Sequence, residues 1–379
     1  MLLNPKAELL HESLTIKLNT LANKLISEGK SVVNLTAGEL NFPTPKYIQT
    51  EVKKNLHLNK YTPTLGAPSL REKIAKKIYK DYKWKVSSKN VGVTAGGKQA
   101  LYECLFAILT PKDEVIVLSP DWVTYRYQII LNDATPVVVP LNENFDLDII
   151  KIKKAISKKT KAIILNSPNN PTGSIYSKAT LLKLKKLLKG KNIYLIVDDI
   201  YSKIIYDKTY KSPAIFAPDK EKLILINGFS KSQALTGWRI GYVVASEAII
   251  KVINSFQSHT TGNTSLLSQI AAEKILDTGD QNKKFISGLK KQRALTDNLL
   301  RSIPKISYKL PSGAFYFFID ISKIEKDGVK FCETLLKKGL ALVPGEAFGR
   351  AGYVRLSFSA GREKITKGIK ILKTFCEKY

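Results

Sequence analysis

Seven short apolar runs in the middle of the chain constrain the fold more than any other feature. They lie at residues 91–94, 115–118, 136–139, 162–165, 193–197, 223–226 and 241–244, with helical patterns between them. Apolar strands that alternate with helices are typical of a mostly parallel sheet that is buried on both faces. We therefore expect an α/β fold whose mostly parallel seven-stranded sheet forms a large domain over residues 43–284.

The pattern changes after residue 285. Helices are expected at 290–302, 329–338 and 362–377, and strands near 306–310, 314–319 and 354–358. An N-terminal helix at 16–28 is expected to pack with these elements. The sequence thus predicts a smaller, discontinuous α+β domain that consists of residues 1–42 and 285–379.

The net charge of +29 raises the question of nucleic acid binding. A basic patch binds phosphates in a salt-dependent way. However, only eight of the 61 basic residues are arginines, and the lysines are spread along the whole chain, as on the solvated face of the helix expected at 181–189. We therefore expect the charge to reflect composition, with no specific nucleic acid partner. A basic nucleic-acid-binding protein is the non-enzyme alternative.

The chain shows neither a membrane span nor a secretion pattern. No apolar run approaches the roughly 20 residues that cross a bilayer, and Glu8 and Glu12 interrupt the N-terminal apolar stretch. Cys104, Cys332 and Cys376 are scattered without a CxxC spacing, which indicates neither a disulfide framework nor a zinc site. We expect a cytoplasmic protein without a metal or a membrane partner.

A lysine and an arginine mark the most informative segment. Lys231 follows Ser230 just beyond the apolar run 223–226, and Arg239 lies eight positions later between two glycines. A desolvated lysine has a lowered pKa, and its neutral amine condenses with an aldehyde to form a Schiff base. The arginine can hold a phosphate through two hydrogen bonds. An aldehyde and a phosphate on one small molecule suggest pyridoxal phosphate; the alternative is a surface lysine on a glycine-containing loop.

Other polar residues follow the apolar runs, where ligands of open α/β sheets bind. A glycine pair that ends at Gly97 opens a helix and lets backbone N–H groups approach a phosphate. Asn170 lies in a Pro/Asn/Gly turn and could donate to a ring oxygen. One of the adjacent Asp198 and Asp199 could hold a pyridine nitrogen protonated, and Tyr201 could reach the same ring. An ordinary turn and a helix N-cap are the alternatives.

Arg355 stands inside an apolar run near the C-terminus. A buried arginine is rare without a carboxylate partner, and no acid lies nearby in the sequence. The carboxylate of a substrate is one possible partner, and an internal salt bridge is the other.

Taken together, these segments resemble the class I aminotransferases of pyridoxal phosphate fold type I. The resemblance extends from about Ser13 to Ser359 and is greatest to the bacterial-type aspartate aminotransferases, some of which also act on prephenate. The matching segments keep the order and spacing of the family: NLTAGE at 34–39, KYTP at 60–63 with Gly66, GGKQAL at 96–101, NNPTG at 169–173, DDIY at 198–201, the segment from 230 to 239, PSGAFY at 311–316, PG at 344–345 and VRLS at 354–357.

The resemblance implies roles for residues around the cofactor. Lys231 matches the lysine that forms the Schiff base, and Asp198 matches the partner of the pyridine nitrogen. Tyr201 and Asn170 match the groups at the ring hydroxyl, and Trp122 matches the aromatic residue that stacks on the ring. Lys231, Asp198 and Tyr201 are thus the expected catalytic residues, and Trp122 and Asn170 are expected to contact the substrate as well.

The resemblance also implies where the phosphate binds. Gly97, Lys98 and Arg239 lie at positions where the family surrounds this group. Tyr61 matches a tyrosine that reaches the phosphate of the neighbouring subunit. The resemblance therefore implies a homodimer with shared active sites.

The resemblance also implies which residues bind the substrate. Gly38 and Arg355 match the site of the α-carboxylate. Lys98, with the hydroxyls of Ser13 and Thr15, fits the binding of a distal carboxylate in the bacterial-type enzymes. A dicarboxylic substrate is therefore expected.

The resemblance implies ping-pong transamination of aspartate with 2-oxoglutarate, which gives oxaloacetate and glutamate. The alternatives are a prephenate, aromatic or alanine aminotransferase and a carbon–sulfur lyase of the same fold. One departure concerns the common Glu-Pro-Asp-Phe of the family, which is Glu39-Leu40-Asn41-Phe42 in this chain. The loop beside Gly38 thus lacks a proline and an acid.

Overall fold

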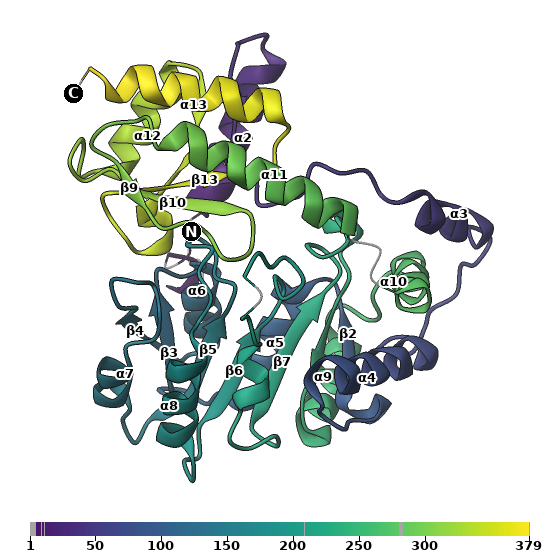
Figure 1. Ribbon diagram of the computed structural model, residues 1–379. Coiled ribbons are helices and arrows are strands. Elements are labelled where there is room, and N and C mark those ends of the chain that lie inside the picture. The colour runs from purple at the N-terminus through teal and green to yellow at the C-terminus, as the bar shows by residue number, and fades with distance from the viewer. Residues whose placement is uncertain (1–4, 9, 11, 208, 280–282, 379) are drawn as a thin grey trace.

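A seven-stranded sheet with helices on both faces forms the lower part of the molecule in Figure 1. The computed structural model describes residues 5–8, 10, 12–207, 209–279 and 283–378. Each of the seven expected apolar runs falls on one strand of this sheet: β2 (Val91–Thr94), β3 (Glu114–Ser119), β4 (Thr135–Pro140), β5 (Thr160–Asn166), β6 (Tyr194–Asp198), β7 (Leu223–Gly228) and β8 (Gly241–Val244). Their order is β2-β8-β7-β6-β5-β3-β4, and within it β8 runs antiparallel to both of its neighbours. The expected α/β fold with a mostly parallel seven-stranded sheet is confirmed.

Two hydrophobic clusters cover the two faces of this sheet. Because successive side chains of a strand point to opposite faces, Val115 and Val117 of β3 pack on one side and Ile116 and Leu118 on the other. The first face is covered by α5 (Gly97–Ile108), α6 (Thr124–Leu131) and α9 (Glu247–His259). The second is covered by α4 (Pro68–Tyr82), α7 (Ile149–Ala155), α8 (Lys178–Leu188) and α10 (Leu266–Thr278).

A smaller antiparallel sheet lies above the large one in Figure 1. Its order is β12 (Val343–Pro344), β13 (Tyr353–Ser357), β10 (Tyr316–Asp320) and β9 (Ser307–Tyr308). Helices α11 (Lys283–Leu300), α12 (Gly328–Lys337) and α13 (Arg362–Cys376) pack around it, with α2 (Leu14–Ser27) beside them. The expected elements of the small α+β part are thus present, whereas the domain boundaries at 42/43 and 284/285 stay a prediction.

Several short elements were not expected from the sequence. β1 (Val33–Asn34) pairs in parallel with β11 (Leu340–Ala341), which attaches the N-terminal segment to the C-terminal part. Such two-residue strands are too short to show an alternating pattern. The remaining elements are α1 (Pro5–Glu8), α3 (Lys46–Lys54) and the 3-10 turns η1 (Ser88–Asn90), η2 (Pro213–Phe216), η3 (Thr236–Trp238) and η4 (Gly345–Phe348).

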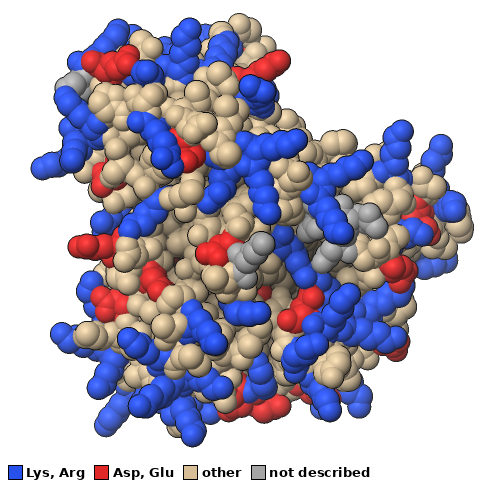
Figure 2. Space-filling view, in the orientation of Figure 1, with Lys and Arg blue, Asp and Glu red and all other residues tan. Residues whose placement is uncertain are grey.

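Basic side chains cover both the upper and the lower part of the face seen in Figure 2, and acidic side chains lie among them. On this face the basic side chains are therefore spread out rather than gathered on one element. In the described part of the chain, no helix has both the length and the apolar character needed to cross a membrane.

Candidate active site

One pocket of about 520 Å³ collects most of the residues that the sequence singles out. It lies at the carboxyl ends of β5 and β6, where α2, α5 and the loop after β7 meet. Tyr61 does not line this pocket, and its side chain is 96% exposed. The other twelve expected residues line it: Ser13, Thr15, Gly38, Gly97, Lys98, Trp122, Asn170, Asp198, Tyr201, Lys231, Arg239 and Arg355.

The two adjacent acids after β6 point to different places. Asp198, the last residue of β6, lines the pocket and is 7% exposed. Its Oδ2 accepts a hydrogen bond from the Tyr125 hydroxyl at 2.7 Å. Asp199 lies in the core instead, where it accepts hydrogen bonds from Tyr82 at 2.7 Å and Tyr210 at 2.8 Å. The structure thus identifies Asp198 as the acid that faces the pocket.

Burial determines the electrostatics of Asp198. Desolvation raises the pKa of its carboxyl, and the hydrogen bond from Tyr125 opposes that rise. None of the described cations lies within ion-pair distance of it. A buried carboxylate in this state favours a cationic ligand group, and a protonated pyridine nitrogen is such a group.

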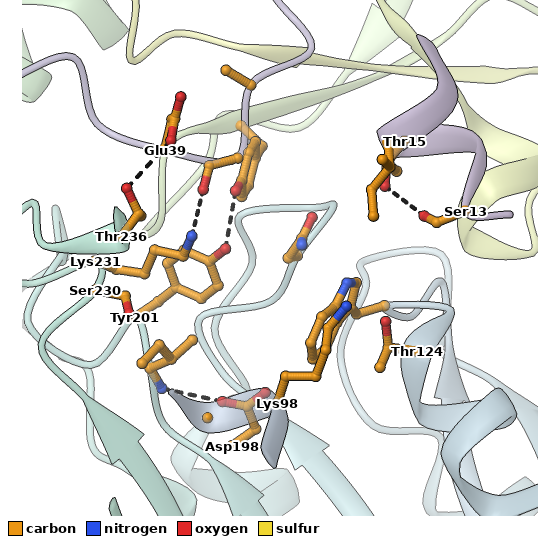
Figure 3. Close-up of a pocket in the computed structure, with 18 of the residues that line it drawn as sticks. Ser13, Thr15, Glu39, Lys98, Thr124, Asp198, Tyr201, Ser230, Lys231 and Thr236 are labelled. Atoms are coloured by element: carbon orange, nitrogen blue, oxygen red, sulfur yellow. Dashed lines mark hydrogen bonds between the residues drawn. The ribbon is translucent and has the colours of Figure 1, made fainter. Parts of the chain in front are cut away.

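Lys231 lies on the opposite side of the pocket from Ser13 and Thr15 in Figure 3. Its Nζ donates a hydrogen bond to the carbonyl oxygen of Gly38. Burial lowers the pKa of Lys231 to about 8, while the nearby Glu39 opposes that change. A lysine with this pKa has an appreciable neutral fraction near neutral pH, so its amine can act as a nucleophile or a base.

A tight turn before α5 forms a cradle for an anion. Gly96 has φ +88°, and a Cβ at this position would lie 2.7 Å from Nη2 of Arg239. The same Nη2 donates a hydrogen bond to the carbonyl oxygen of Ala95 at 3.1 Å. Gly97 begins the twelve-residue helix α5, whose first N–H groups have no partner within the helix. A helix N-terminus beside an arginine suits the phosphate of the expected cofactor.

Arg355 of β13 is 3% exposed and reaches the pocket from the small sheet. Its Nη1 donates to Oδ1 of Asn170 at 2.9 Å, and its Nη2 donates to the carbonyl oxygen of Thr36 at 2.7 Å. Its Nε is buried without a hydrogen-bond partner. No acid of the described residues lies within ion-pair distance of Arg355, so the internal salt bridge is not found there. A carboxylate from outside the chain would satisfy this guanidinium.

The bond from Arg355 also orients Asn170. Because Oδ1 of Asn170 accepts from Arg355, its amide nitrogen remains as a donor, and no hydrogen bond from that nitrogen to another described residue is present. Tyr201 lines the same pocket, and its hydroxyl is 2.9 Å from that of Tyr316. Asn170 and Tyr201 can thus offer two hydrogen-bonding groups to one ring oxygen.

A second cation lies farther out in the pocket. The Nζ of Lys98 stands 5.2 Å from the centre of the Trp122 ring, in a cation–π arrangement. Partial burial lowers the pKa of Lys98, and Arg239 lowers it further. Ser13 and Thr15 share a hydrogen bond of 2.8 Å between their hydroxyls.

Several lining residues were missed by the sequence interpretation. Thr36 and Tyr316 belong to segments that carry the family resemblance, and Tyr125 lies three residues after Trp122, but nothing in their spacing predicts their hydrogen-bond partners. Within the described residues, no three His, Cys, Asp or Glu side chains come together in a metal-binding group.

The chain is similar to known proteins along most of its length. A family model described as aminotransferase class I and II matches residues 30–372. The chain is 40% identical to an aspartate aminotransferase from Thermotoga maritima over 96% of each chain. It is 36% identical to an aspartate/prephenate aminotransferase from Thermus thermophilus over 97% of each. A solved structure of aspartate aminotransferase from Thermus thermophilus with maleate superposes with a TM-score of 0.94 at 35% identity and covers 99% of both chains.

Proposed function

Because the chain belongs to the class I and II aminotransferases, which depend on pyridoxal phosphate, we propose that it transfers the amino group of aspartate to 2-oxoglutarate. The products are oxaloacetate and glutamate, formed in two half-reactions with ping-pong kinetics. The names of the relatives support aspartate as a substrate, and the maleate bound to the Thermus thermophilus enzyme is a dicarboxylate.

One observation carries the proposal: besides Lys231 and Arg239, which we assign to the cofactor, two more cations line the pocket without an acid partner among the described residues. Arg355 is buried at its floor, and Lys98 stands over Trp122 farther out. A monocarboxylic amino acid supplies one negative charge after its amine has reacted, whereas a dicarboxylic one supplies two. Arg355 would hold the α-carboxylate and Lys98 the distal carboxylate.

The other residues of the pocket have separate roles in the proposed reaction. Bound pyridoxal phosphate supplies an electron sink for the negative charge that develops at the substrate Cα. Asp198 would keep the ring nitrogen protonated, helped by the hydrogen bond from Tyr125. Lys231, with a pKa of about 8, would take the proton from Cα and return it later in the reaction. Asn170 and Tyr201 would orient the ring through its hydroxyl oxygen.

The phosphate would be held by the N-terminus of α5 and by Arg239. We also propose a homodimer in which Tyr61 of one subunit reaches the phosphate held by the other. The 96% exposure of Tyr61 within its own chain supports this role, since none of the described residues covers the ring. Two measurements test the shared site. The size of the protein in solution should correspond to a dimer, and a Tyr61→Phe variant should release the cofactor more readily than the wild type.

A side-by-side substrate panel tests the proposed activity. The enzyme loaded with pyridoxal phosphate is given aspartate, alanine, phenylalanine or cystathionine as donor and 2-oxoglutarate as acceptor. We expect aspartate to show the highest kcat/KM. An enzyme that prefers alanine or phenylalanine, or that releases pyruvate from cystathionine without needing an acceptor, would contradict the proposal.

Prephenate is the second candidate substrate, as an alternative acceptor. It also carries a carboxylate distant from its oxo acid group, and the Thermus thermophilus relative is named for both aspartate and prephenate. The same panel, repeated with prephenate in place of 2-oxoglutarate, shows whether this chain shares that activity.

A further inference from the structure

A network of side-chain amides behind the pocket fixes the orientation of a further lining residue, Asn19. The backbone N–H of Thr36 can only donate a hydrogen bond, and it donates to the Asn34 side chain at 3.0 Å. The accepting atom must therefore be Oδ1 of Asn34. The opposite atom of this amide is then Nδ2, which donates to Asn19 at 2.9 Å.

The orientation of the Asn19 amide in α2 follows from the same hydrogen bonds. The atom that accepts from Asn34 must be Oδ1, and the Thr36 hydroxyl lies 3.1 Å from that oxygen. Nδ2 of Asn19 therefore points the other way. It has two hydrogens to donate, and it makes no hydrogen bond to the residues that the structure describes, although Asn19 lines the active-site pocket.

The position of Asn19 on α2 indicates which part of a ligand it can reach. Thr15 and Asn19 lie four residues apart, on the same face of the helix, and both line the pocket. Figure 3 shows α2, with Ser13 and Thr15, across the pocket from Lys231. A substrate that reacts at Lys231 therefore extends its far end towards this helix.

We propose that Asn19 is a specificity-determining residue that donates a hydrogen bond from Nδ2 to the distal carboxylate of the substrate. This inference rests on the proposed use of a dicarboxylic amino acid. The amide acts beside Lys98 and the hydroxyls of Ser13 and Thr15, and it adds a donor of fixed direction to a cation on a flexible side chain. Because the bond from Asn34 already holds Asn19 in place, little side-chain freedom is lost when the ligand binds.

The isosteric variant Asn19→Asp isolates this donor. Its first carboxylate oxygen still accepts from Nδ2 of Asn34, so this bond behind the pocket is kept. Its second carboxylate oxygen takes the place of Nδ2. A donor is thus replaced by a negatively charged acceptor that repels the distal carboxylate of the substrate. Asn23→Asp is the matched control, since Asn23 also accepts from Nδ2 of Asn34 at 3.0 Å but is exposed and does not line the pocket.

Steady-state kinetics of the loaded enzyme provide the first measurement. A hydrogen bond to a charged group changes binding by about tenfold or more, so we expect Asn19→Asp to raise KM for aspartate and 2-oxoglutarate by about that factor, with kcat within about twofold. Alanine should be affected by less than about twofold, and Asn23→Asp should match the wild type for all substrates. An equal loss for aspartate and alanine, or no loss for aspartate, overturns the proposal.

Ligand binding provides a second measurement that needs no turnover. Succinate and butyrate have the same four-carbon chain, but only succinate has a second carboxylate. By calorimetry, Asn19→Asp should weaken succinate at least about tenfold and leave butyrate nearly unchanged. If both weaken equally, Asn19 does not recognise the distal group. A wild-type enzyme that binds butyrate as tightly as succinate would instead contradict the proposed dicarboxylic substrate, so the two failures are distinguishable.

Discussion

Tyr125 donates its hydroxyl hydrogen to Oδ2 of Asp198 across a distance of 2.7 Å, and both side chains are buried. The tyrosine comes from α6 and the aspartate from the end of β6, so the bond connects a helix to the strand that positions the acid. A hydrogen bond to a carboxylate favours its charged form. Tyr125 therefore offsets part of the desolvation that raises the pKa of Asp198.

Removal of this hydroxyl should reduce catalysis more than binding. In Tyr125→Phe the pKa of Asp198 should rise further, and its carboxylate should hold the ring nitrogen protonated less well. We expect kcat with aspartate to fall by about tenfold, the size of one hydrogen bond to a charged group, while KM changes little. Tyr127→Phe, on the same helix but outside the pocket lining, is the control. A loss confined to KM would contradict the role given to Tyr125.

The pKa of Lys231 predicts how the cofactor-free enzyme reacts with added pyridoxal phosphate. Burial lowers this pKa to about 8, so the amine becomes neutral as pH rises through that value. We expect the rate of covalent attachment to rise roughly tenfold per pH unit below about 8 and to level off above it. Borohydride reduction followed by mass spectrometry measures the attached cofactor, and Lys231→Ala should remain unlabelled. A rate that keeps rising to about pH 10 would show an unshifted lysine.

Lys98 should matter most for substrates with two carboxylates. We expect Lys98→Ala to lower kcat/KM for aspartate at least about tenfold more than for alanine, since the variant removes a charge-assisted contact. Lys183→Ala, an exposed lysine of α8, controls for the loss of one positive charge. An equal loss for both amino acids would assign Lys98 to the phosphate alone.

Asp199 should make stability depend on pH. Burial raises its folded-state pKa from 3.8 to about 6. The folded protein therefore binds this proton more tightly than the unfolded chain does. The contribution of Asp199 to the free energy of unfolding is fully present below about pH 3.8 and is lost as the pH rises through about 6. The shift corresponds to about 3 kcal/mol at most.

The variant Asp199→Asn has no proton to lose at this position. We compare the free energy of unfolding of the variant with that of the wild type, both measured with urea. The variant's value minus the wild-type value should increase by up to about 3 kcal/mol as the pH rises from about 4 to 6, and it should stay constant at higher pH. Glu143→Gln, an exposed acid, controls for the removed charge. A difference that does not vary with pH would show that Asp199 is not protonated on folding.

The sequence predicts the parts of this site that depend on local pattern. Lys231 and the pair Asp198 and Asp199 could be identified because they follow apolar strands, and the carboxyl ends of parallel strands meet at one edge of the sheet. The local pattern does not separate the two acids, and only the family resemblance singles out Asp198. The structure shows that the carboxyl of Asp198 meets Tyr125 and that of Asp199 meets Tyr82.

Residues that act through distant partners escape the sequence interpretation. Nothing in the order of the chain predicts that the carbonyl of Thr36 accepts from Arg355, or that Asn34 orients Asn19. The short pair β1–β11 was missed because two residues show no alternation. Only the family resemblance, which matches individual residues to those of the family, covers such segments.

The bond between Arg355 and Thr36 joins residues 319 positions apart in the chain. A ribosome that synthesises this protein releases Thr36 early and Arg355 near the end. The large sheet, whose strands all come from residues 91–244, can form while synthesis continues, because domains generally fold as units during synthesis. The bond between Arg355 and Thr36 cannot form at that stage, because it requires strand β13, which pairs with β10 and β12 in the small sheet. The floor of the pocket is therefore completed only when β13 enters that sheet.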